Sequence, residues 1–282
     1  MPKIIKQCYR DKTEQGSRHL FRFFMLILLA ESKTMASQQK QIDPSVFDQH
    51  TPVFEEVADA IMANIEQLSP GDISEILGVS HQLAIKSRSL AYDFPLKLTG
   101  YQALYGFTGE AFKGLDATSL SEDGVNNAFQ DLKFVSSVYG WLNASDIIKP
   151  YRCEFNKPIA PGKKTPIEVF KPKNTVELVK EIKERKIQDV INLLPGDADK
   201  CIDWKIVRAF AKVHKVCFRV MTPDGNLKTP LTHRLKELRG LMARTILNEN
   251  IQSFKELTEI ESDHFVFSPV DSKPLLPVFI SD

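Results

Sequence analysis

The chain has 282 residues, of which 43% are hydrophobic and 26% are charged. This ordinary globular composition excludes a disordered, collagenous or coiled-coil protein. The 37 basic side chains nearly balance the 36 acidic ones, so no overall field draws the protein to nucleic acid or to a membrane. Any site for a polyanion must therefore be local.

The amino terminus has two interpretations. Residues 1–24 carry six basic and two acidic side chains, and the apolar run Phe23–Ala30 overlaps their end. A basic stretch before a short apolar run is typical of a signal peptide. The competing interpretation, which we favour, is a fully buried first strand over Met25–Ala30, with residues 1–24 a disordered basic leader or a misassigned start. No stretch reaches the roughly 20 apolar residues of a membrane span.

Helical periodicity dominates the next part of the chain. Apolar residues recur at helical spacing over Val53–Leu68. Two shorter helices follow over Asp72–Leu77 and His81–Tyr92, joined by a very tight connection. Aromatic residues mixed with glycines over Gly100–Gly114 predict closely packed backbone away from solvent.

The second half alternates helices and strands. The expected elements are a helix from Ser121 to Tyr139, loops or edge strands around Pro150, Pro158, Pro161 and Pro166, a helix over Asn174–Lys186, a buried strand over Asp189–Leu194, a hairpin of Val216–Met221 with Leu227–Leu231, and a helix from about Arg234 to Leu247. This order predicts the α/β class, with a mixed sheet and surrounding helices in one domain over residues 25–282.

One motif carries candidate chemistry. Residues 71–93 have the shape of a helix-hairpin-helix, in which an apolar residue, a glycine and another apolar residue precede a helix with a polar start. The glycine permits a tight turn, and the second helix begins with free amide groups and the positive end of its dipole. We predict that this turn binds one DNA phosphate through Gly78, Val79, Ser80 and His81.

Two basic residues follow on the second helix. Lys86 or Arg88 would neutralise a neighbouring phosphate. They lie about 160° apart around the helix axis, so at most one of them contacts the DNA directly. The alternative is an ordinary αα corner buried in a core.

Short segments in a fixed order connect the chain to a known family. They are Met25–Leu28 with Lys33-Thr34, Gly109–Leu115, Ser121–Asp123, Tyr139-Gly140, Pro150–Glu154, Val190–Leu193 and Arg239–Arg244. Together they resemble the YaaA family of bacterial peroxide-stress proteins, from about Met25 to Phe267. The resemblance implies a cytoplasmic protein that binds DNA and limits oxidative DNA damage, in association with lowered free intracellular iron. It also implies an unusual α/β fold with a helix-hairpin-helix, and Met25 as the natural start.

Six polar residues match the family's motifs, and we predict that they share a basic cleft. They are Lys33, Tyr151, Arg152, Glu154, Arg239 and Arg244. Arginines hold phosphate or carboxylate with paired donors, and a tyrosine can stack on a base or donate a hydrogen bond. The alternative is structural, with Arg152 and Glu154 as neighbours in a ladder and Arg239 as a cap on loops.

The chain also departs from the family pattern. Where the family has Ser-Pro-Ala before its lysine, this chain has Ala30, Glu31 and Ser32, and a Lys-Gly-Asp-x-Tyr motif is replaced around Gly109 and Phe112. Chemistry that needs those lost hydroxyl and amine groups is in doubt. Phosphate binding by backbone amides is not, because it does not depend on side-chain identity.

Other chemical signatures are weak. The six histidines show no metal-binding spacing, and Cys201, His214 and Cys217 read better as strand and core than as ligands, so no metal and no cofactor are expected. Four scattered cysteines without a CxxC pair fit a reducing cytoplasm. Hydrolase, NTPase and dinucleotide motifs are absent, although Glu110, Asp146 or Glu154 could still serve as a general base.

These observations lead to one main hypothesis. The chain is predicted to bind the DNA backbone, duplex or branched, without sequence specificity and to protect it during peroxide stress. One alternative is an enzyme that acts on a small phosphorylated or nucleotide-like ligand in the same cleft. A third possibility is a protein that sequesters iron.

Overall fold

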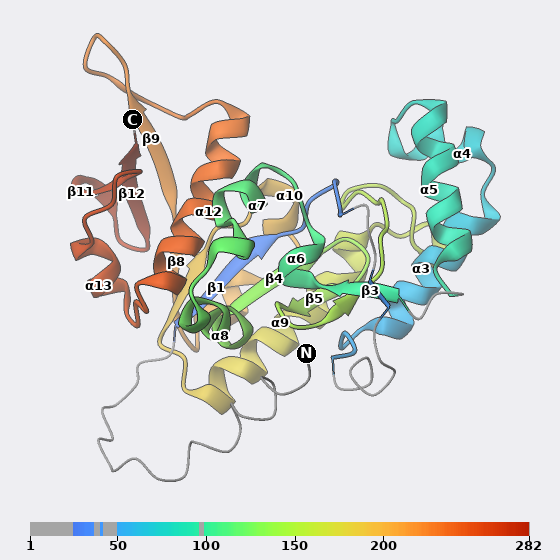
Figure 1. The fold of residues 1–282 in the computed structure, drawn as a ribbon, viewed down its shortest axis with the longest axis horizontal. Coiled ribbons are helices and arrows are strands. Elements are labelled where there is room, and N and C mark those ends of the chain that lie inside the picture. The colour runs from blue at the N-terminus through green and yellow to red at the C-terminus, as the bar shows by residue number, and fades with distance from the viewer. Residues whose placement is uncertain (1–24, 37–39, 42–49, 96–98, 282) are drawn as a thin grey trace.

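The computed structural model describes residues 25–36, 40–41, 50–95 and 99–281, so the predicted leader at 1–24 lies outside the described residues. The order of elements confirms a mixed α/β architecture, built from three sheets and their surrounding helices. Figure 1 shows a central sheet flanked by helices, with an arm of helices at one end and a second sheet at the other.

The central sheet has five strands. Their order is β5 (Gly140–Asn143), β4 (Leu132–Ser136), β1 (Met25–Ala30), β7 (Asp189–Asn192) and β8 (Lys212–Lys215). The middle strand β1 runs parallel to both β4 and β7, β8 is parallel to β7, and β5 is antiparallel to β4. The predicted buried strands at the start of the chain and after residue 188 are both confirmed.

Strand β1 is apolar on both faces because both faces are covered. Ile27 and Leu29 point into one hydrophobic cluster, and Leu26 and Leu28 point into the other. All are buried, as expected for a central parallel strand. Helix α9 (Pro166–Arg185) covers the second face, and α8 (Glu122–Asp131) and α12 (Thr232–Asn248) contact β1 from the first.

The arm consists of three helices, α3 (Glu55–Gln67), α4 (Pro70–Leu77) and α5 (His81–Asp93). They confirm the three helices predicted for this part of the sequence. Buried residues of all three belong to the same hydrophobic cluster as the first face of β1, so the arm is anchored in the main core.

A small sheet and three short helices complete this part of the chain. They are the sheet of β2 (Lys40–Gln41), β3 (Thr99–Gln102) and β6 (Ile147–Ile148), with the helices α6 (Ala103–Gly106), α7 (Glu110–Leu115) and η2 (Ala117–Ser119). Of the aromatic residues predicted to pack here, Tyr101, Phe107 and Phe112 are buried, and the ring centroids of the two phenylalanines are 5.0 Å apart, whereas Tyr105 is exposed.

A second sheet forms the carboxyl-terminal part. Its strands are ordered β10 (Leu227–Lys228), β9 (Cys217–Met221), β12 (Leu276–Ser281) and β11 (Val266–Lys273), and α13 (Phe254–Glu259) contacts it. The predicted hairpin is confirmed by the antiparallel pairing of β9 with β10.

Two predicted elements are wrong in extent. The helix expected from Ser121 to Tyr139 ends at Asp131, because the apolar residues after it form β4 and pair with β1. Helix α9 begins at Pro166, where a loop or edge strand was expected, because Thr165 and Glu168 cap its start and proline is favoured at the first helical position. The remaining short helices are η3 (Pro161–Lys163), α10 (Gly196–Asp199) and α11 (Trp204–Val207).

Candidate functional site

A cleft of about 630 Å³ opens at the carboxyl ends of β1 and β7. Residues 29–34 line it from β1, and residues 193 and 195–198 line it from β7. The chain places β4 on one side of β1 and β7 on the other, so the strand order reverses between β1 and β7. In open α/β sheets, ligands bind outside the strand ends at such a reversal. We call this hollow the strand-end cleft.

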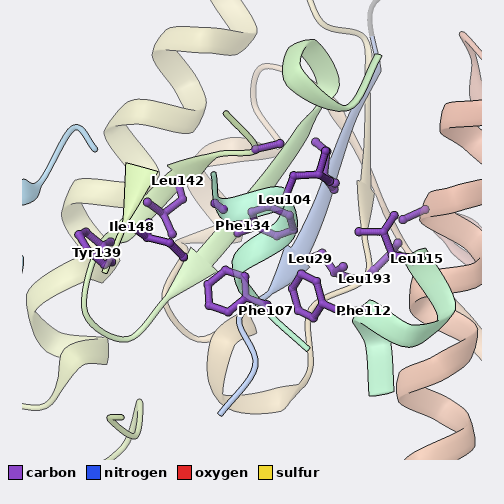
Figure 2. Close-up of a cluster of buried hydrophobic side chains, with 14 of the residues drawn as sticks. Leu29, Leu104, Phe107, Phe112, Leu115, Phe134, Tyr139, Leu142, Ile148 and Leu193 are labelled. Carbon is purple, nitrogen blue, oxygen red and sulfur yellow. The ribbon is translucent and has the colours of Figure 1, made fainter. Parts of the chain in front are cut away.

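The floor of the strand-end cleft is apolar. Leu29, Phe112 and Leu193 line it, and Figure 2 shows these side chains packed with Phe107. Such a floor lowers the local dielectric, which strengthens hydrogen bonds and ion pairs made above it.

One wall depends on a close contact between α7 and α12. A Cβ atom on Gly240 would lie 1.7 Å from the carbonyl oxygen of Ala111, and one on Gly114 would lie 2.3 Å from that of Glu237. Only glycine therefore permits this approach. The contact places Lys236 and Arg239 of α12 in the wall, three residues apart and on one face of the helix.

Arg239 is the predicted cleft residue with the most unusual environment. Its side chain is half-buried, and burial lowers the pKa of its guanidinium, an effect that nearby Asp199 and Cys217 partly offset. The group nevertheless stays charged at neutral pH. Within the described part of the chain, Arg239 forms no ion pair or hydrogen bond. Arg239 is therefore a cation of the cleft with no carboxylate within ion-pair distance among those residues.

Lys33 and Glu154 line the strand-end cleft, and Arg152 contacts Lys33 without lining the cleft itself. The Lys33 ammonium lies 2.7 Å from a carboxylate oxygen of Glu154. Arg152 donates from Nη1 to the Lys33 carbonyl oxygen at 3.4 Å, and its buried Nε has no hydrogen-bond partner among the described residues. Arg152 and Glu154 lie in a loop, so they are not neighbours in a strand ladder.

Beneath this group, Glu31 accepts three hydrogen bonds. Ser137 donates from its backbone amide at 2.9 Å and from its hydroxyl at 2.5 Å, and the Tyr151 hydroxyl also donates. Because the Tyr151 proton goes to Glu31, the Tyr151 oxygen accepts from the Ser136 hydroxyl, which itself accepts from two backbone amides. Burial raises the pKa of Glu31, and these hydrogen bonds offset part of the rise.

Burial and the adjacent Glu31 also raise the pKa values of Tyr151 and Cys153 well above their ordinary range. The phenol and the thiol therefore stay protonated at neutral pH, and the thiol is a weak nucleophile.

Sequence reasoning missed two residues of the strand-end cleft. Glu31 counted only as a departure from the family pattern, although a carboxylate directly after a buried parallel strand is a usable signal. Lys236 was overlooked although it stands three residues before Arg239 on the same predicted helix.

The turn between α4 and α5 is the second place where predicted residues meet. Gly78 adopts the left-handed conformation, with φ 66° and ψ 40°. Its amide and that of Val79 both donate to the Ser74 carbonyl oxygen. Ser80 caps α5 by accepting from Leu83, while the amides of Ser80, His81 and Gln82 have no acceptor within the described residues. Gly78 therefore shapes the turn, and the amides of Ser80, His81 and Gln82 are the free donors.

The basic residues around this turn differ in whether they are free to contact a phosphate. Arg88 donates from Nε to the carbonyl oxygens of Glu66 and Leu68 and so caps the end of α3. Lys86 is exposed. The Lys157 ammonium, which the sequence did not single out, lies 3.8 Å from where a Cβ atom on Gly78 would stand. Loop 149–165 carries it there.

In the part of the chain that the structure describes, no three His, Cys, Asp or Glu side chains form a metal-binding group. The trio of Cys201, His214 and Cys217 does not form one: His214 instead contacts Asp189 through Nε2 at 2.6 Å and stacks on Phe254.

Comparison with known proteins identifies the family. The family described as peroxide stress protein YaaA matches residues 25–270, most of the chain. This chain belongs to the YaaA family. It is similar to UPF0246 proteins of Shewanella woodyi and Shewanella sediminis, at 27% and 28% identity over 90% of this chain and 98% of each relative. A UPF0246 protein of Aliivibrio fischeri is 28% identical over 90% of this chain and 97% of its own length.

Two YaaA motif residues, Arg244 and Tyr151, make their contacts outside the strand-end cleft. Arg244 donates to the carbonyl oxygens of Leu115, Asp116 and Ser119, which joins α12 to the end of α7. Tyr151 is buried in the Glu31 network and does not line the strand-end cleft. Among the described residues, no helix of this YaaA protein combines the length and apolarity needed to cross a membrane.

Proposed function

We propose that this peroxide stress protein protects DNA by contacting the sugar-phosphate backbone at the turn between α4 and α5, in the manner of a helix-hairpin-helix. The observation that carries the proposal is the set of free donors at the start of α5, from Ser80 to Gln82, beside the Lys157 ammonium. Amides at a helix start and an adjacent cation suit one phosphate without any reading of the bases.

The approach of Lys157 has a structural cause. Asn64 on α3 donates from Nδ2 to the Ile159 carbonyl oxygen at 2.8 Å, which fastens loop 149–165 to the arm. Lys157 forms no ion pair within the described residues, so its charge is available. Because Gly78 has no side chain, nothing from this residue separates the Lys157 ammonium from a ligand at the turn.

The charge of the arm limits the DNA footprint. Residues 55–93 contain seven carboxylates and only two basic side chains, with the acids at Glu55, Glu56, Asp59, Glu66, Asp72, Glu75 and Asp93. A DNA duplex laid along α3 or α4 would meet like charges. The phosphate contact is therefore confined to the turn, with Lys86 and Lys157 as its cations.

The experiment is fluorescence anisotropy of the full chain with duplex and branched DNA across a salt series. The logarithm of the affinity should fall by about 0.9 per phosphate contact for each tenfold rise in salt, which gives a slope of about −1 for the single phosphate at the turn. Replacing both cations (Lys86→Gln with Lys157→Gln) should weaken binding and make the slope shallower.

Lys255→Gln is the matched control, because Lys255 is exposed on α13 far from the arm. It should leave affinity and slope unchanged. A double variant at Lys86 and Lys157 that binds like the parent protein would refute the assignment to the turn. The link to lowered free iron stays a prediction, which metal analysis of protein purified without chelators tests.

A further inference from the structure

We propose that the strand-end cleft binds a small phosphate monoester, with the phosphate held by Arg239 and Lys236 and the organic body on the apolar floor. This inference goes beyond the DNA contact at the α4–α5 turn. It uses other residues, and Figure 1 places α12 and the arm in separate parts of the molecule.

The first argument is the uncompensated charge of Arg239. A half-buried guanidinium loses hydration, and that loss is normally offset by an anion or by acceptor groups. Among the described residues, no anion or acceptor lies within ion-pair or hydrogen-bond distance of Arg239, and Asp199 offsets only part of the loss, although the contact between Gly240 and Ala111 holds α12 firmly in place. A bound oxyanion would supply the missing partner through paired N–H donors.

The second argument is the charge balance of the cleft. Four carboxylates line it, and each is already engaged: Glu110 with Lys113 at 2.6 Å, Glu154 with Lys33 at 2.7 Å, Asp197 with Lys200 at 2.9 Å, and Glu31 with its hydroxyl and amide donors. Lys236 and Arg239 remain as two positive charges without ion-pair partners in the described structure. They match a phosphate monoester, which carries close to two negative charges at neutral pH, better than a DNA diester with one.

The third argument is the shape of the site. Its volume of about 630 Å³ is within the usual range for small-molecule pockets. Leu29, Phe112 and Phe155 provide apolar lining in the same cleft as the two cations. A site with one charged end and an apolar floor suits an organic phosphate rather than a free inorganic ion.

The test compares four probes on the full chain by calorimetry and thermal shift. The probes are adenosine 5′-monophosphate, adenosine, inorganic phosphate and succinate. We expect the monophosphate to bind best and to raise the melting temperature, because a ligand specific for the folded state stabilises it. Equal effects of adenosine and its monophosphate would overturn phosphate recognition, and preferential binding of succinate would overturn the choice of a phosphate ligand.

The variants locate the phosphate. Arg239→Gln should weaken binding of the monophosphate by about 10-fold or more, and Lys236→Gln by a smaller factor, since charge-assisted hydrogen bonds are lost. Arg234→Gln is the control, because Arg234 is on the same helix, pairs with Glu237 and does not line the cleft. Unchanged affinity in both Arg239→Gln and Lys236→Gln would overturn the proposal.

This proposal and the DNA proposal fail separately. The Lys86 and Lys157 double variant should keep full affinity for the monophosphate, whereas Lys236→Gln should keep its affinity for duplex DNA at the turn. Should Arg239→Gln fold poorly, the exposed Lys236→Gln change still decides the outcome.

Discussion

Asp146 is buried in the turn between β5 and β6 and is held in place by Asn143. The Asn143 amide donates to one carboxylate oxygen at 2.8 Å, and the Asn143 side chain donates to the other at 3.1 Å. Burial nevertheless dominates and raises the pKa of Asp146 to about 6. The carboxyl keeps in the folded state a proton that the unfolded chain has already lost at that pH.

We expect this shift to produce a specific pH dependence of stability. The contribution of Asp146 to the free energy of unfolding is fully present below pH 4 and is lost as the pH rises through 6. We therefore expect the free energy of unfolding of the wild-type protein to fall by about 2–3 kcal/mol over this range because of this residue. The Asp146→Asn variant has no carboxyl group at this position, so its stability lacks this pH dependence. Urea unfolding of both proteins at pH 4, 5, 6 and 7 should show their difference shifting in favour of the variant as pH rises, and a constant difference would contradict it.

The Tyr151 hydroxyl links two buried groups, Glu31 and Ser136. Its removal should therefore destabilise the fold more than removal of the hydroxyl of an exposed tyrosine. Tyr151→Phe leaves Glu31 without one donor and Ser136 without its acceptor, so we expect a loss of about 1–3 kcal/mol in the free energy of unfolding. Tyr105→Phe is the control, since Tyr105 is 37% exposed, and it should change stability by less than about 0.5 kcal/mol. Equal losses in the two variants would contradict a structural role for the network.

The pairing of α7 with α12 is the element contact on which the strand-end cleft depends. Gly240→Ala places a methyl group against the Ala111 carbonyl, so the helices must separate, and we expect a loss of about 3 kcal/mol or more. Gly196→Ala is the matched change, because nothing lies within 4 Å of an added Cβ there. Denaturant unfolding should separate the two variants clearly, and a tolerated Gly240→Ala would mean that α12 can shift.

The elements that were predicted well have strong local signals. Helix α3 shows a periodic apolar face, and the hairpin of β9 with β10 has an Asp-Gly turn. Residues 132–136 were misread because a short apolar run after a helix looks the same whether the helix continues or a central strand begins. The pairing of β4 with β1 decides that question, and the two strands lie far apart in sequence.

The candidate site was predictable only where sequence motifs mark its residues, and not where contacts between distant segments decide it. Lys33, Glu154 and Arg239 were found from family motifs and do line one cleft, whereas Arg244 is turned toward loop carbonyls and Tyr151 toward the core. Lys157 could not be found, because its place beside Gly78 comes from a loop contact with α3 and not from spacing along the chain.

Across the whole molecule, the core argues for one folding unit. Residues of the arm, of the first face of β1, of α12 and of the second sheet belong to the same hydrophobic cluster, so no apolar boundary separates them. We therefore expect a single cooperative transition, with equal calorimetric and van't Hoff enthalpies and coincident curves from circular dichroism and tryptophan fluorescence. Two resolved transitions would show that the arm or the second sheet unfolds on its own.

The place of β1 also matters for biosynthesis. Its six apolar residues emerge from the ribosome long before their partners, since β4 begins at Leu132 and β7 at Asp189. At a synthesis rate of about 5–20 residues per second, the strand waits on the order of 5–20 s before its first neighbour is made. During that interval it is an unpaired, uncharged segment able to aggregate. The nascent chain thus has a stronger need for a holding chaperone than the composition of the finished protein suggests.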